Sequence, residues 1–358
     1  MFTALIFLAV LSLLVLSHEA GHYFVARRSG MDVEEFGFGF PPRLFSWTRR
    51  GTIYSFNLIP LGGFVKLRGE DGEDRRAGSF ASASKGRRFA VLIAGVTMNL
   101  VLAWVLLSVG YLRGLPTVLD GNVEAARAAS SSWVEVVSLV PGSPAEEAGL
   151  MRGDRILAVD GVNAGVMDAD AVRSRIKEHP LGESVALRVA RGKDDRVLSI
   201  PLKELTPGTV AIGTHLATIG FLRFGFFTAL WEGLRATWAI TVATVFGFVD
   251  LLRGLFAGSG VASEVSGPVG IAVMTGEMAR RGLGYLLYFA ALLSVNLAVL
   301  NVLPIPALDG GRVLFLLLEV VRRRPVTARL EQWVHGIGFA ALLLLVGFVT
   351  IKDISGLF

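Results

Sequence analysis

Residues 2–22 read FTALIFLAVLSLLVLSHEAGH, and this stretch decides the class of fold. The run from Phe2 to Ser17 carries no charge, and with Ala20–Ala26 behind it the apolar stretch is long enough to cross most of a bilayer. A signal peptide carries positive charge before its apolar core, whereas here Arg27 and Arg28 follow it. The pattern predicts an uncleaved membrane helix whose N-terminus lies outside the cell.

The composition of the 358 residues agrees with a membrane protein. Hydrophobic residues make up 53% even without the 42 glycines, which argues against an ordinary soluble domain. The absence of cysteine rules out a disulfide scaffold, a thiol nucleophile and a Cys-ligated metal. Lys and Arg total 35 against 30 Asp and Glu, and basic clusters at 85–88 and 322–324 flank apolar runs. This excess therefore indicates cytoplasmic loops rather than a nucleic-acid surface.

Other apolar runs extend the pattern to about four transmembrane helices. A fifth run, 226–256, is interrupted by charges that include Arg235, and we expect it to lie in the interface or against the bundle. If 226–256 crossed the bilayer fully, the next run, 285–303, would cross in the opposite direction and its C-terminal end would face outward. The three further runs expected to cross are about 89–112, 285–303 and 333–351.

Residues 130–205 differ in character, because strand-like alternation and turn residues replace the apolar runs. Ser143-Pro144-Ala145-Glu146 matches a helix start, with a Ser cap, Pro at the first position and Glu three residues after the cap. The run PGSPAEEAGLMRGDRILAVDGV, 141–162, resembles a PDZ domain of bacterial envelope proteases. Such domains bind extended peptides by strand addition. A small α+β spacer without a ligand is the alternative.

The motif HEAGH, residues 18–22, carries the candidate chemistry. His18 and His22 lie one helical turn apart on the same face, so both imidazoles can reach one cation. Glu19 is rotated away by about a third of a turn, as is usual for a carboxylate that contacts metal-bound water. Titratable groups inside a membrane-grade segment are costly and mark functional sites. The motif therefore predicts a catalytic metal site.

A catalytic zinc usually has three protein ligands, so a third is needed. The stretch NVLPIPALDGG, 301–311, follows the third apolar run, and Asp309 is the only acidic residue between Glu277 and Glu319. If that run crosses from outside to inside, Asp309 arrives at the depth of the two histidines. A helix cap is the structural alternative for Asp309, and Glu277 or Glu319 are the rival ligands.

Four motifs together resemble the site-2 protease family of intramembrane metalloproteases. They are HEAGH, AGVTMN at 94–99, SGPVG at 266–270 and NVLPIPALDGG at 301–311, and the likeness is greatest to the bacterial regulator of sigma-E protease group. Two features depart from the family: Val96 stands where proline is common, and one PDZ unit is visible where some members have two.

The resemblance implies one Zn²⁺ per chain, held by His18, His22 and Asp309, with Glu19 as general base and then proton donor to the leaving amine. It also implies a region that binds substrate backbone or a developing oxyanion. The prolines there break the helix beside a wet cavity. Capping of broken-helix carbonyls is the alternative role for the asparagines. The substrate-binding residues implied are Asn301, Asn296, Pro304 and Pro306.

Residues 31–84 contain a candidate β-loop. Gly37–Pro42 is followed by two short strand signals, Thr52–Leu58 and Phe64–Leu67, which are separated by Gly and Pro. The resemblance implies a membrane-associated β-loop that pairs with an unwound substrate. An ordinary cytoplasmic hairpin is the alternative.

The expected architecture is an α-helical polytopic membrane protein with about four transmembrane helices, a membrane-associated β-loop and one inserted extracytoplasmic PDZ domain of α+β type. The expected segments are a first span with HExxH at 1–30, the β-loop region at 31–84, a second span at 85–112, the PDZ domain at 130–205, an extracytoplasmic or interfacial helical region at 206–283, a third span at 284–311, a cytoplasmic loop at 312–331 and a fourth span at 332–352.

The expected function is zinc-dependent cleavage of single-span membrane proteins, such as pre-trimmed anti-sigma factors or remnant signal peptides. The expected location is the bacterial inner membrane, with the active site near the cytoplasmic side and the PDZ domain outside. Peptide C-termini are candidate partners of the PDZ domain, and no nucleic acid is expected. A non-catalytic PDZ-bearing scaffold with a structural metal is the alternative, although a structural site would not need Glu19.

Overall fold

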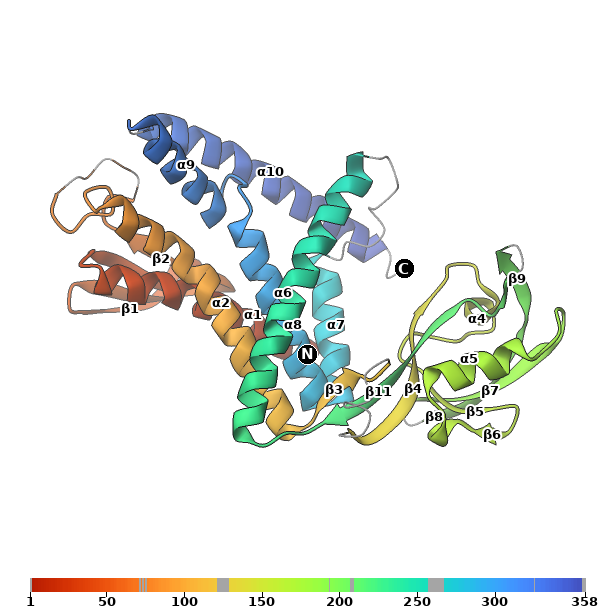
Figure 1. The fold of residues 1–358 in the computed structure, drawn as a ribbon. Helices are drawn as coiled ribbons and strands as arrows, with labels where there is room; N and C mark the ends of the chain where they lie inside the picture. Colours follow the sequence, from red (N-terminus) through yellow and green to blue (C-terminus); the bar gives the residue numbers. More distant parts are fainter. Residues whose placement is uncertain are drawn as a thin grey trace. The chain divides into compact units, whose positions relative to one another are not determined.

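The computed structural model describes residues 2–70, 72, 74, 76–120, 129–192, 194–206, 209–256, 267–324 and 326–355. The chain divides into two compact units, one made of Met1–Val109 with Leu230–Phe358 and the other of Gly110–Ala229 (Figure 1). The first unit is mainly helical and holds the histidine motif. The second unit is built on a β-sheet.

Five described helices are long and apolar enough to cross a membrane. The predicted count of four spans is therefore not confirmed, because 226–254 meets the same criteria of length and hydropathy. Its charges are paired one turn apart, since Arg235 Nη1 lies 3.0 Å from Glu232 Oε1 and Arg253 Nη1 lies 3.3 Å from Asp250 Oδ1. Pairing lowers the cost of carrying charge on an apolar helix. The five are α1 (Phe2–Arg28), α2 (Lys85–Arg113), α6 (Phe226–Phe256), α8 (Leu283–Val302) and α10 (Ala328–Ser355).

The third predicted span ends earlier than expected. Helix α8 stops at Val302, and a new helix, α9 (Asp309–Arg322), begins at Asp309 inside the predicted span 284–311. Prolines have no backbone N–H and clash with the preceding turn, so Pro304 and Pro306 account for the break. Residues 312–322, expected in a cytoplasmic loop, are helical.

The SGPVG motif begins helix α7 (Pro268–Arg281), although its Ser266 lies outside the described residues. Gly267 is the N-cap and offers no side chain, so the cap comes from another helix. The Asp353 carboxylate of α10 accepts hydrogen bonds from Gly267 N at 3.1 Å and Gly270 N at 2.7 Å. An acidic group at this position also suits the helix dipole.

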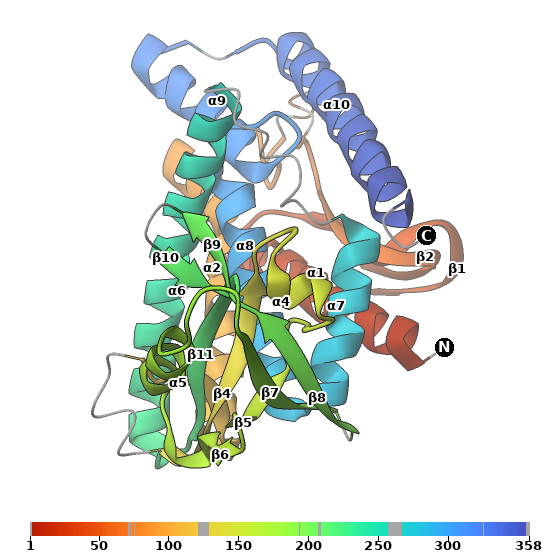
Figure 2. The ribbon, with the colours of Figure 1, turned by 90° about the vertical axis from the view of Figure 1, so that its right-hand side faces the viewer.

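The β-loop region forms one antiparallel hairpin of β1 (Val33–Arg49) and β2 (Thr52–Leu67). Residues 52–67, expected to form two short strands, are one continuous strand, although its pairing with β1 in the described residues skips Pro60, Leu61 and Gly62 and resumes with Gly63 opposite Phe38. Residues 53–56 pair with β1 on both sides, with 35–38 and with 45–48, and the register shifts there. Strand β2 packs along α1 (Figure 2).

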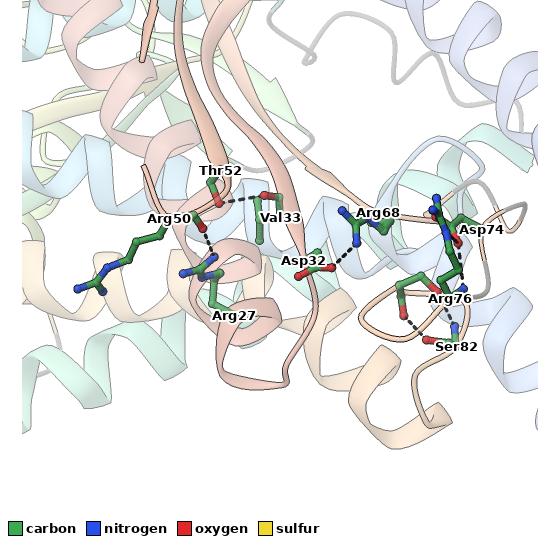
Figure 3. A network of polar contacts seen from close by, with 10 residues as sticks. Arg27, Asp32, Val33, Arg50, Thr52, Arg68, Asp74, Arg76 and Ser82 are labelled. Atoms are coloured by element: carbon green, nitrogen blue, oxygen red, sulfur yellow. Dashed lines mark hydrogen bonds and ion pairs between the residues drawn. The ribbon is translucent and has the colours of Figure 1, made fainter. Parts of the chain in front are cut away.

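Polar contacts support both ends of this hairpin and the loop that follows it (Figure 3). Arg76 donates to the Asp74 carboxylate at 2.7 Å, and these hydrogen bonds lower the pKa of Asp74 to about 2. The pair thus stays ionised and mutually neutralised at physiological pH. Other contacts are Thr52 Oγ1 to the Val33 carbonyl at 2.9 Å, Arg68 to Asp32 at 2.5 Å and Arg27 to the Arg50 carbonyl at 3.3 Å.

The second unit is wider than the predicted 130–205. Its seven-stranded sheet has the order β3-β11-β4-β5-β7-β8, with β6 paired to β5. Residues 214–222, expected in a helical region, form β11 because they hydrogen-bond to both β3 and β4. The strands of this sheet are β3 (Leu115–Val118), β4 (Ala129–Leu139), β5 (Arg155–Val159), β6 (Val162–Asn163), β7 (Ser184–Arg191), β8 (Asp194–Pro201) and β11 (Thr214–Leu222).

Two described helices of this unit begin at side-chain caps, of which the first, Ser143, agrees with the sequence pattern. Ser143 accepts from Glu146 N at the start of α4 (Pro144–Glu147), and Asp168 accepts from Ala171 N at the start of α5 (Ala169–Lys177). The helices and the sheet enclose an apolar core. Fully buried members of this core include Val134, Val136, Val159, Val172, Val185, Leu187 and Val189. The smaller elements are β9 (Lys203–Thr206), β10 (Thr209–Ala211) and a 3₁₀ turn at Ala164–Val166.

Candidate metal centre

Three predicted ligands meet between α1 and the start of α9. His18 Nε2 and His22 Nε2 lie 3.1 Å apart on α1. Asp309 Oδ2 lies 3.0 Å from His18 Nε2 and 3.2 Å from His22 Nε2. Both histidines are buried, and the contact joins two ends of the first unit that are distant in sequence. The structure therefore brings together all three residues that the motifs singled out as ligands.

The geometry of these atoms fits a divalent metal. Bonds of about 2.0–2.1 Å in a tetrahedral site separate the ligand atoms by about 3.3–3.4 Å, close to the separations of His18, His22 and Asp309. Two imidazoles and one carboxylate with an open fourth position are the donor set of a catalytic zinc. Among the described residues, these three form the one group of His, Cys, Asp or Glu side chains placed to share a metal.

The rival ligand Glu319 has other partners. Its carboxylate accepts from Arg88 Nη1 at 2.9 Å and from Val326 N at 3.2 Å. The Glu319 backbone carbonyl accepts from Lys85 Nζ at 3.0 Å. These contacts tie α9 to α2 and account for the burial of Glu319 without a metal.

Helix α2 forms the wall of the site, which the sequence analysis did not anticipate. His22 Nδ1 lies 2.8 Å from the Val91 carbonyl, so its N–H donates there and Nε2 faces Asp309. A Cβ on Gly95 would lie 2.4 Å from His22 Nε2 and 2.6 Å from His18 Cε1. A glycine is required here because any side chain would occupy the space of the imidazoles. The only sequence signal was the glycine within AGVTMN.

Glu19 lies beside the ligands and beside the hairpin. It is half-buried and interacts electrostatically with both histidines and with Asp309. Strand β2 comes close to it, since a Cβ on Gly63 would lie 3.4 Å from Glu19 Cγ. The candidate base is thus next to the 63–67 segment of β2, whose pairing partners among the described residues all lie on one edge, in the first part of β1.

The four predicted substrate-binding residues lie on α8 and in the break after it. Asn301 is buried, and the Asn296 amide oxygen accepts from Thr244 Oγ1 of α6 at 3.3 Å. Pro306 touches α10, where a Cβ on Gly338 would lie 2.4 Å from Pro306 Cβ. Substrate contact by Asn301, Asn296, Pro304 and Pro306 stays a prediction.

His335 of α10 has no partner at metal-ligand spacing in the sequence, yet it supports the break before Asp309. The Ala307 N–H donates to His335 Nδ1 at 2.8 Å. Ala307 has a φ of 76°, a backbone angle that residues other than glycine rarely adopt. The hydrogen bond to His335 therefore stabilises a strained turn. No sequence spacing could show the contact, because it joins the turn to a separate helix.

A polar cavity of about 730 Å³ lies one helical turn beyond Asp309. Arg312 lines it and forms an ion pair with Glu70, which follows β2. A charged cavity of this size can hold water, which peptide hydrolysis consumes. Its lining also includes Glu34, Lys66, Asp74, Arg76, Glu331, Gln332 and His335.

Two histidines and a carboxylate around one point, with a glutamate following the first histidine, define the HExxH class of metallopeptidases. The profile of peptidase family M50 matches residues 6–345, and the chain belongs to this family, the site-2 proteases. The protein is thus an intramembrane metalloendopeptidase.

Relatives match along nearly their whole length. A Rhizobium meliloti protein with a zinc metalloprotease name is 34% identical, and the match covers 98% of this chain and 96% of the relative. Zinc metalloprotease RasP of Geobacillus kaustophilus is 30% identical, and the match covers 98% of this chain and 97% of the relative. The regulator of sigma-W protease RasP of Bacillus subtilis is 29% identical over 99% of each.

Solved structures of PDZ domains match part of the chain. The PDZ domain of an SdrC-like protein from Listeria monocytogenes is 26% identical, with a TM-score of 0.22. The match covers 24% of this chain and 86% of that one.

Proposed function

We propose that this protease holds one zinc ion through His18, His22 and Asp309 and uses Glu19 as its general base. The observation that carries the proposal is the convergence of the three ligand atoms within 3.0–3.2 Å of one another. Zinc bound there supplies Lewis acidity toward water and the scissile carbonyl. Glu19 accepts the proton of the attacking water and returns it to the leaving amine.

The proposed substrates are single-span membrane proteins, such as pre-trimmed anti-sigma factors or signal-peptide remnants. The name of the Bacillus subtilis relative, a regulator of sigma-W protease, supports a role in regulated intramembrane proteolysis. A helix hides its scissile carbonyl in its own hydrogen bonds, so it must unwind locally. Strand β2 beside Glu19 offers replacement backbone partners to the unwound segment.

We further propose that the protein lies in the bacterial inner membrane, with the metal site toward the cytoplasmic side. Arg27 and Arg28 end α1 just beyond the histidines, which supports this orientation. The 110–229 unit would lie outside the cytoplasm and act as a PDZ filter against untrimmed substrates or a reader of new C-termini.

Replacement of Asp309 by Ala tests the ligand set. We expect bound zinc to fall from about one per chain to near zero, because two neutral imidazoles alone leave a catalytic site one ligand short. The measurement is metal content of the purified protein by mass spectrometry, paired with a chelator-sensitive cleavage assay. Glu277→Gln is the matched control and should keep both zinc and activity. Unchanged zinc in Asp309→Ala would assign the third ligand elsewhere, and zinc without chelator-sensitive cleavage would favour the scaffold alternative.

Replacement of Gly63 by Val tests the role of β2. A Cβ there would lie 3.1 Å from the Gly37 carbonyl oxygen and 3.3 Å from Val15 Cγ1, so a branched side chain must push β2 away from Glu19. We expect cleavage of a single-span substrate in liposomes to fall at least about tenfold, since misplacement by about 1 Å can cost as much as 10²-fold. Zinc content should not change. Full activity of Gly63→Val would remove β2 from the substrate path.

A further inference from the structure

The two histidines of the metal site contact different kinds of group on α2. His22 has a backbone carbonyl, that of Val91, at 2.8 Å from its Nδ1. His18 Nδ1 has the side-chain amide of Asn99 at 3.3 Å. Val91, Gly95 and Asn99 are spaced four residues apart, so they form one stripe on the face of α2 that meets the two imidazoles.

A histidine that binds a metal through Nε2 must carry its proton on Nδ1 and needs an acceptor there. In the structure the Asn99 Nδ2 faces His18 Nδ1, an arrangement in which His18 Nδ1 would have to accept. Asn99 Oδ1 is meanwhile buried without a hydrogen-bond partner among the described residues. The amide thus presents its nitrogen where a metal-ready His18 needs an acceptor, and the amide oxygen is left without a donor among the described residues.

A half-turn of the amide about the Cβ–Cγ bond resolves both mismatches. It places Oδ1 toward His18 Nδ1–H and leaves the His18 Nε2 lone pair facing His22 and Asp309. The backbone of Asn99 is held in place during this turn, because its carbonyl accepts from Ser294 Oγ of α8 at 2.7 Å. Asn99 and Ser294 are both fully buried, so water does not compete for these bonds.

We infer that Asn99 is a positioning residue that accepts from His18 Nδ1–H and thereby prepares His18 Nε2 to bind the zinc. The inference rests on the proposed zinc site and adds to it a residue that touches neither metal nor substrate. It gives the asparagine of the AGVTMN motif a chemical role.

The experiment measures zinc affinity of the full-length protein in detergent by competition with a chelating dye. Asn99→Ala and Asn99→Leu remove the acceptor, and we expect the zinc Kd to rise about 10–100-fold, as for other acceptors behind metal-binding histidines. Asn99→Asp keeps an acceptor at this position and should restore Kd to within about threefold of the parent. Thr97→Ala, which loses an exposed hydrogen bond within α2 from Thr97 Oγ1 to the Ile93 carbonyl, is the matched control and should stay within about twofold.

The outcomes separate this inference from the proposed function. A parent protein that binds no zinc would overturn the proposed function itself. A parent that binds zinc, with Asn99→Ala within about twofold of it, would overturn this inference alone. Equal zinc affinities of Asn99→Asp and Asn99→Ala would also overturn it. In that case the acceptor at position 99 would not matter, and Asn99 would act through packing alone. Thermal unfolding of the metal-free proteins identifies any variant that fails to fold, and if Asn99→Leu fails, Asn99→Ala decides.

Discussion

Replacing Glu19 by Gln should abolish proteolysis and leave zinc in place. Glutamine is nearly isosteric with glutamate but cannot take the proton of the attacking water or return it to the leaving amine. General acid–base groups contribute about 10²–10⁴-fold to rate, and Glu19 serves both steps, so we expect a loss of at least about 10³-fold. The histidines and Asp309 are untouched, and zinc should remain near one per chain.

The measurement pairs cleavage of a single-span substrate in liposomes with metal analysis of the same preparation. Glu277→Gln is the control for removal of one carboxylate from the helical unit. Retained activity in Glu19→Gln would contradict the assigned base. Loss of zinc together with activity would instead make Glu19 part of the metal-holding structure.

Replacing Gly95 by Ala should remove the zinc altogether. The added Cβ would lie 2.4 Å from His22 Nε2 and 2.7 Å from His18 Nε2, so both imidazoles must move. Metal–ligand distances tolerate only about ±0.2 Å, and the surrounding packing leaves the rings little room. Helix α2 itself should not suffer, because Ala is favoured over Gly in a helix by about 1 kcal/mol.

Gly86→Ala is the matched control for this second prediction. It lies on the same helix, and a Cβ there meets nothing within 4 Å. We expect Gly86→Ala to keep zinc and activity and Gly95→Ala to lose both while remaining folded by thermal unfolding. Normal zinc content in Gly95→Ala would contradict the placement of α2 against the two histidines.

The parts of the site that sequence could predict are those that depend on local spacing. A helix places residues four apart on one face, so His18 and His22 could be paired from the motif alone. Asp309 could be added because charged residues are scarce in that apolar region. The cap at Ser143 is equally local, and it is present in the structure.

The parts that sequence could not predict depend on contacts between distant segments. Gly95 and Asn99 matter because α2 lies against α1, and nothing in their own helix indicates this. Strand β11 pairs with β3 and β4 across long loops, which widened the second unit beyond 130–205. The span count of four is not confirmed, because 226–254 meets the criteria of length and hydropathy and its Arg235 is paired with Glu232 across the helix surface.

The division of the ligands between α1 and α9 has a consequence for biosynthesis. His18 and His22 are made first, but the proposed third ligand, Asp309, follows only after the described helices α2, α6, α7 and α8 and the whole sheet unit. A ribosome-bound chain that stops before α9 carries two histidines and no complete metal site. If Asp309 is the third ligand, a chain that has not yet been extended through α9 cannot hold zinc, and proteolysis would begin only after this late segment is made.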